Sequence, residues 1–122
     1  MGSRLRGRVV AGAVHDPGFR EALRRRLERE EAKVSLHEEV ATLRAGIERL
    51  HPDVCILDFD LADSGGADLA RQARALGIPV VLVSAHLLPL ENPFPEGLPT
   101  LTLPFGRKAL LDLLTQVLNP AA

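Results

Sequence analysis

The stretch that decides the fold runs from Pro52 to Asp58 and reads PDVCILD. Its apolar residues are typical of a β-strand buried on both faces, and the run ends on a carboxylate. Two further aspartates, Asp60 and Asp63, follow closely, and a pair of glycines comes after them. Because open α/β sheets bind ligands outside the carboxyl ends of their strands, Asp58 is the first candidate for a functional residue.

Around this stretch, apolar strand-like runs alternate with amphipathic helical segments. The patterns predict strands at residues 8–14, 32–36, 54–57, 78–84 and 100–103, and helices at residues 17–30, 39–50, 67–76 and 107–118. Apolar strands separated by helices predict a parallel sheet joined by right-handed crossovers. The segment from Leu87 to Pro99, between the fourth and fifth strands, contains four prolines. We therefore expect the helix of this connection, which would be the fourth in chain order, to be absent or cut to a turn.

The length and composition favour one globular domain over residues 1–122, with a structured core at about residues 8–118. The net charge of −1 gives no reason to expect nucleic acid or a membrane surface as a partner. Arginines at 24–26 alternate with Glu21, Glu28, Glu30 and Glu31, which is typical of a solvated helix face. No apolar run approaches the roughly 20 residues of a membrane helix and no secretory signal is visible, so the simplest expectation is a cytoplasmic protein.

Cysteine and histidine give no independent sign of a site. Cys55 is the only cysteine, which excludes an intramolecular disulfide and an all-cysteine metal site. It lies within a buried-looking strand and is expected to be an inert apolar residue. His37, His51 and His86 share no spacing and are interpreted as surface residues.

Several motifs, taken in order, resemble the receiver domain of response regulators in two-component signalling, over essentially the whole chain. They are PDVCILD at residues 52–58, Gly66, IPVVLVSA at residues 78–85, and Leu103-Pro104-Phe105. The resemblance implies a doubly wound, five-stranded parallel sheet of the flavodoxin-like type. It also implies a cis peptide bond before Pro104, as is general at that place in the family.

The resemblance implies a role for each acidic residue at the carboxyl edge. Asp58 matches the aspartate that accepts a phosphoryl group, and Ser84 matches the hydroxyl that hydrogen-bonds it. Asp58 and the backbone carbonyl of Asp60 would bind Mg²⁺, because metal and fixed donors must neutralise the phosphoryl charge. Asp16 could supply another metal ligand, or it could instead cap the helix that follows it.

Three parts of the family's pattern are missing: the acidic pair, the lysine and the aromatic residue of the fifth strand. Val14 and His15 stand where the family has its metal-binding acidic pair, and Leu103 stands in place of its lysine. Valine cannot bind a metal, and imidazole suits zinc or copper better than magnesium. Thr100 replaces the aromatic residue of the fifth strand. We therefore expect poor Mg²⁺ affinity, and we expect no firmly bound cofactor.

These observations leave three hypotheses about function. The first is a non-enzymatic pseudo-receiver in a phosphorelay-type pathway, which acts through contact with a kinase or a downstream regulator and keeps Asp58 as a relic. The second is a stand-alone response regulator that is phosphorylated on Asp58, with Asp16 holding the metal. The third is an Asp-x-Asp phosphatase built on Asp58 and Asp60, although its second motif at Asp63-Ser64 is two residues too close.

Two further hypotheses concern charge and assembly. A protonated His15 could pair with Asp58 and so replace the missing metal by an internal cation. The last helix is apolar over more than one face, and leucine beyond one packed stripe would suit a homodimer or a docking partner. Its apolar residues are Leu110, Leu111, Leu113, Leu114, Val117 and Leu118.

Overall fold

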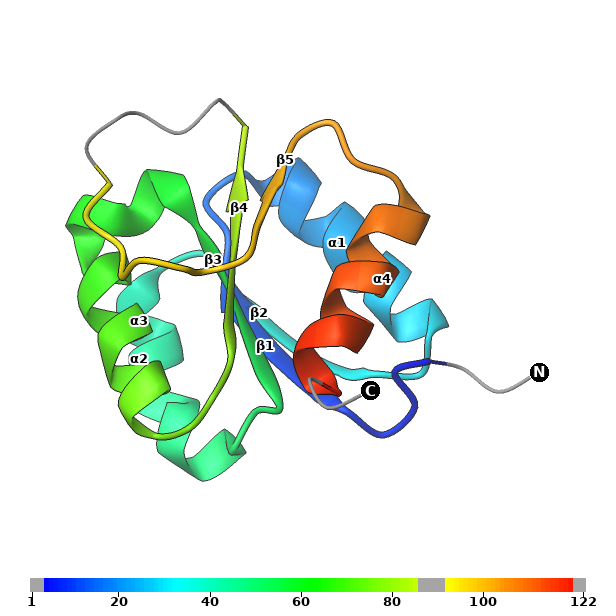
Figure 1. The fold of residues 1–122 in the computed structure, drawn as a ribbon, viewed down its shortest axis with the longest axis horizontal. Helices are drawn as coiled ribbons and strands as arrows, with labels where there is room; N and C mark the ends of the chain where they lie inside the picture. The colour runs from blue at the N-terminus through cyan, green and yellow to red at the C-terminus, as the bar shows by residue number, and fades with distance from the viewer. Residues whose placement is uncertain (1–3, 86–91, 120–122) are drawn as a thin grey trace.

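The computed structural model describes residues 4–85 and 92–119. Its five parallel strands are β1 (Val9–Ala13), β2 (Lys33–His37), β3 (Val54–Asp58), β4 (Val80–Ser84) and β5 (Thr100–Thr102). Its helices are α1 (Pro17–Arg29), α2 (Val40–Leu50), α3 (Gly66–Ala75), α4 (Arg107–Leu118) and a 3₁₀-helix, η1 (Phe59–Ser64). The strand order β2-β1-β3-β4-β5, with α2 and α3 on one face and α1 and α4 on the other (Figure 1), confirms the predicted doubly wound, flavodoxin-like sheet.

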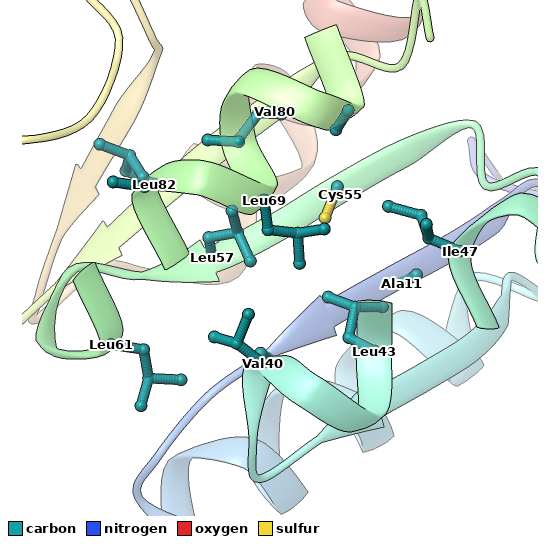
Figure 2. Close-up of a cluster of buried hydrophobic side chains, with 14 of the residues drawn as sticks. Ala11, Val40, Leu43, Ile47, Cys55, Leu57, Leu61, Leu69, Val80 and Leu82 are labelled. Atoms are coloured by element: carbon teal, nitrogen blue, oxygen red, sulfur yellow. The ribbon is translucent and has the colours of Figure 1, made fainter. Parts of the chain in front are cut away.

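The core lies in two layers, one on each side of the sheet, because successive strand residues point to opposite faces. In β3 all five residues are buried. Cys55 and Leu57 pack under α2 and α3, in the cluster that Figure 2 shows, whereas Val54 and Ile56 pack under α1 and α4. The strand is therefore the centre of the molecule, as its unbroken apolar run predicts.

The sequence prediction missed η1 and placed several element ends differently. Directly after β3, the Asp58 carboxylate accepts a hydrogen bond from the Asp60 amide and so begins the 3₁₀ turn. Gly65 ends the turn with a φ of 97°, a conformation that favours glycine. The strand predicted at 78–84 begins only at Val80, and the strand predicted at 100–103 ends at Thr102.

The proline-rich segment behaves as its composition indicates where it is described. Residues 92–99 contain no helix, and Phe94 is buried in the core layer beneath α2 and α3. Residues 86–91, and with them the surface position predicted for His86, lie outside the described residues. Residues 92–99 therefore form an irregular segment that contributes one aromatic ring to the core.

One glycine of β1 permits the close packing of the two central strands. A Cβ atom built on Gly12 would lie 2.5 Å from the backbone oxygen of Ile56 in β3 and 3.0 Å from a methyl group of Leu36 in β2. Real Cβ contacts are longer than the first of these, so any side chain at this position would force the strands to shift. The central strand pair therefore depends on a residue without a side chain.

The charged face of α1 is largely as predicted, with one correction. Arg24 pairs with Glu21 and Glu28 along the exposed side of the helix. Glu30 was expected among these solvated residues, but it is 6% exposed and pairs with Arg107 at the beginning of α4. Glu30 is the C-cap of α1, and its ion pair with Arg107 links the end of α1 to the beginning of α4.

The last helix exposes less leucine than its sequence suggests. Leu110, Leu111 and Leu114 are buried, and its other large apolar residues are partly buried against the same core layer. Among the described residues, the one large apolar side chain classed as exposed is Leu76, at the end of α3. The proposed reason for a homodimer is thus weakened, and dimerisation stays a prediction.

Candidate functional site

A hollow of about 300 Å³ opens at the carboxyl edge of the sheet, beyond the ends of β3 and β4. Its walls include all four residues predicted from the sequence to form a site, namely Asp16, Asp58, Asp60 and Ser84. They come from the loop after β1, the end of β3, the start of η1 and the end of β4. The parallel sheet brings these separate segments together because every strand ends at the same edge.

Asp58 is the buried acid of this hollow, with only 7% of its surface exposed. One carboxylate oxygen accepts a hydrogen bond from the backbone amide of His15, and the other accepts one from the amide of Asp60, both at 3.0 Å. Within the described part of the chain, no Lys, Arg or His nitrogen forms an ion pair with it. The carboxylate therefore joins the loop after β1 and the beginning of η1 to the end of β3.

Asp16 acts as the N-cap of α1. Its side-chain oxygen accepts a hydrogen bond from the amide of Phe19 at 2.7 Å, and Pro17 begins the helix. This is the capping role that the sequence offered as the alternative to metal binding. The carboxylate also lies on the wall of the hollow, and its assignment as a metal ligand stays a prediction.

Val14 and His15 differ sharply in their surroundings. Val14 is fully buried in the core layer beneath α1 and α4, whereas the side chain of His15 is exposed. The Arg20 guanidinium donates to the backbone oxygens of both residues, at 2.9 and 3.2 Å, and so fixes the loop. His15 reaches Asp58 through its backbone amide, and the imidazole forms no ion pair in the described residues. The pair between a protonated His15 ring and Asp58 stays a prediction, and the ring has the exposure of a loop histidine.

Leu103 and its neighbours form the wall of the hollow beside β5. The Leu103-Pro104 peptide bond is cis, as the resemblance implied. The Leu103 amide donates to the backbone oxygen of Ser84 at 2.7 Å, and Leu103 lines the hollow. The leucine side chain thus stands at the position where the resemblance leads us to expect a lysine. Phe19 and Phe105 meet edge to face, with ring centroids 5.9 Å apart. This side of the hollow is thus apolar.

The side chains around the hollow do not fit a magnesium ion. Magnesium requires oxygen ligands in near-octahedral geometry, and the loop after β1 offers a buried valine and an exposed imidazole. Asp58 is the buried acid of the hollow, and the carboxylate of Asp16 caps a helix. In the described ranges, no three His, Cys, Asp or Glu side chains gather as a potential metal site.

The model of the response regulator receiver domain family matches residues 14–89, which is more than half of the chain. The chain belongs to this family. The acidic motif follows the third strand of this fold, whereas the phosphatase interpretation requires it after the first strand. Among the described residues, no helix has the length and apolar character to cross a membrane.

Solved structures agree with this fold at low sequence identity. A CheY-like receiver domain protein from Methanospirillum hungatei is 20% identical, with a TM-score of 0.81 and coverage of 93% of this chain and 95% of that one. The chemotaxis protein CheY4 of Vibrio cholerae is 18% identical, with a TM-score of 0.78 and coverage of 91% and 98%. A mutant of the anti-anti-sigma factor PhyR from Bartonella quintana is 22% identical, with a TM-score of 0.78 and coverage of 98% and 51%. The search of curated proteins found no match.

Sequence reasoning missed two parts of the site. Arg20 fixes the loop after β1 through backbone oxygens, and no motif marks an arginine for that role. The pairing of Phe19 with Phe105 joins α1 to the residues after β5. Each residue carries an ordinary helix or loop signal by itself, so only the folded arrangement reveals the contact.

Proposed function

We propose that this receiver domain is an atypical, non-enzymatic pseudo-receiver that acts by binding a protein partner, without depending on phosphorylation. The observation that carries the proposal is the state of Asp58. Its two oxygens accept hydrogen bonds from the backbone amides of His15 and Asp60, and no Lys, Arg or His side chain of the described residues forms an ion pair with it. In this role the carboxylate maintains the shape of the edge that a partner recognises.

The surrounding residues support this role chemically. Transfer of a phosphoryl group onto a carboxylate brings two like charges together, and bound metal and fixed cations normally offset their repulsion. Here the core position of Val14 cannot accept a carboxylate without burying its charge, and the side chain of Leu103 carries no charge. The unphosphorylated form is therefore the working form of the domain in our proposal.

The partner in this proposal is a kinase or a downstream regulator in the cytoplasm. Support for a protein partner comes from the family and from the names of its structural neighbours, one of which is an anti-anti-sigma factor about twice the length of this chain. We propose neither a nucleic acid nor a membrane as partner. A homodimer stays a weaker alternative.

The test is the intact mass of the protein after incubation with acetyl phosphate and Mg²⁺. We expect no phosphoryl adduct on the wild type or on Asp58→Asn, with circular dichroism confirming that both are folded. The double variant His15→Asp/Leu103→Lys serves as a matched control, because it supplies an acid and a cation at exposed or half-buried positions. An adduct on the wild type that Asp58→Asn abolishes would overturn the proposal.

That opposite result would establish the second candidate, a phosphorylatable response regulator. The observation in its favour is that Asp58, Ser84 and Asp16 share one hollow. In that case Asp16→Asn should abolish the Mg²⁺-dependent adduct, since no other acid is available in the loop after β1.

A further inference from the structure

Two neighbouring hollows at the carboxyl edge of the sheet are lined by acidic side chains. The first contains Asp16, Asp58 and Asp60, and the second, of about 310 Å³, contains Glu38 and Glu39. They share His15, and no Lys or Arg of the described chain belongs to either lining. This edge therefore carries a negative field that is strongest where the walls exclude water.

Asp58 is the buried acid of this region, and its hydrogen-bond acceptor positions are only partly used. A buried carboxylate pays a large desolvation cost unless it is paired and hydrogen-bonded. An ionised carboxylate can accept about four hydrogen bonds, and Asp58 accepts two in the described residues. Arg20, in the first turn of α1, donates to the backbone oxygens of Val14 and His15 and does not pair with it.

We propose that the hollow at Asp58 binds a lysine or arginine side chain that a protein partner supplies. This inference rests on the proposed function and names the chemistry of its contact. The cationic head would reach the remaining acceptor positions of Asp58, and Leu103, Val83 and Phe19 would cover the methylene stem. A hollow of about 300 Å³ has room for such a side chain.

The acids around the opening determine which partner fits. Asp16, Asp60, Glu38 and Glu39 are exposed, and they would attract a basic segment before its side chain enters. The same charges repel phosphates, which disfavours a nucleic acid or an anionic membrane. A free metal ion is disfavoured because the donor groups around Asp58 do not fit one. A basic protein segment remains the occupant that matches both the buried acid and its surroundings.

The experiment is an NMR titration of the isotopically labelled full chain with the blocked peptides Gly-Lys-Gly and Gly-Arg-Gly, at constant ionic strength. The amides of His15 and Asp60 report on the site directly, because both donate to Asp58. We expect saturable shifts of these amides with the basic peptides and none with blocked Gly-Glu-Gly. Asp58→Asn should weaken binding by about tenfold or more, since it removes the buried charge.

Two variants make the result specific. Asp68→Asn removes an exposed carboxylate of α3 that pairs with Arg71, so it changes the net charge equally and should leave binding unchanged. Leu103→Lys supplies a cation from within the chain and should prevent peptide binding while Asp58 is present. This second variant keeps the test decisive even if Asp58→Asn is poorly folded.

The inference is overturned if the wild type shows no saturable shift, or if Asp68→Asn weakens binding as much as Asp58→Asn does. No phosphodonor is present in this titration. A phosphoryl adduct on the wild type in the mass experiment would refute the proposed function whatever the peptides do. Absence of both adduct and peptide binding would refute the cation site alone.

Discussion

Replacing Asp58 by alanine should destabilise the domain, although it removes a negative charge from an acidic edge. The two backbone hydrogen bonds of the carboxylate, both 3.0 Å long, join the loop after β1 and η1 to β3. A hydrogen bond to a charged group contributes about 1.5–3 kcal/mol, and these are partly buried, so the lower value is appropriate for each. The pair should then contribute about 3 kcal/mol.

Charge repulsion opposes this contribution. Asp16 and Asp60 lie on the same hollow but are exposed to solvent, so water and salt weaken their repulsion of Asp58 to about 1 kcal/mol or less. The expected net loss for Asp58→Ala is therefore about 2 kcal/mol in the free energy of unfolding. Asp58→Asn keeps one acceptor oxygen and should lose about half as much.

Urea unfolding followed by far-UV circular dichroism at neutral pH measures these differences directly. The order of stability should be wild type, Asp58→Asn, Asp58→Ala, with an unchanged dependence on urea concentration. Asp68→Asn, which removes an exposed surface acid, should change stability by less than about 0.5 kcal/mol. If either Asp58 variant were more stable than the wild type, repulsion would dominate and the structural role of Asp58 would be refuted.

Three further predictions concern the core and β2. Gly12→Ala should lower the free energy of unfolding by about 1–3 kcal/mol, because its Cβ would lie 2.5 Å from the Ile56 oxygen. Gly46→Ala on α2, where the new Cβ would have no contact closer than 3.8 Å, should raise it by about 0.5–1 kcal/mol. Urea unfolding measures both variants, and equal effects would contradict the close strand packing. Burial raises the pKa of Cys55 from 9.0 to about 12, so iodoacetamide should modify this thiol only in the unfolded protein. Because the unfolded thiol ionises more readily than the folded one, the stability of the fold should fall as pH rises from 9.0 towards 12. Rapid labelling of the native protein would argue against this burial. Burial lowers the pKa of His37 below 6.5, because it disfavours the protonated imidazole in the folded state. The stability that the neutral ring permits is therefore present above pH 6.5 and is lost on acidification. Urea midpoints measured on both sides of that pH should differ less in His37→Gln than in the wild type.

Local sequence predicted most of the architecture. The unbroken apolar runs at β3 and β4 predicted buried parallel strands, and the apolar spacing of residues 107–118 placed α4 with the bounds that the structure has. Strand and helix periods are properties of neighbouring residues, so a single sequence records them directly. The ends of elements were less certain, because hydrogen bonds across the chain determine where β4 begins and where η1 forms.

The sequence by itself determined the alternation of strands and helices, the acid at the end of β3 and the absence of the expected acids and lysine at Val14, His15 and Leu103. Tertiary structure alone decided how Asp58 is used. Its partners are amides of the loop after β1 and of η1, and the first of these lies 43 residues away along the chain. The burial of Glu30 against α4 was likewise decided by folding. Side-chain identity limits the chemistry a residue can perform, but its partners depend on which distant segments the sheet brings to the same edge.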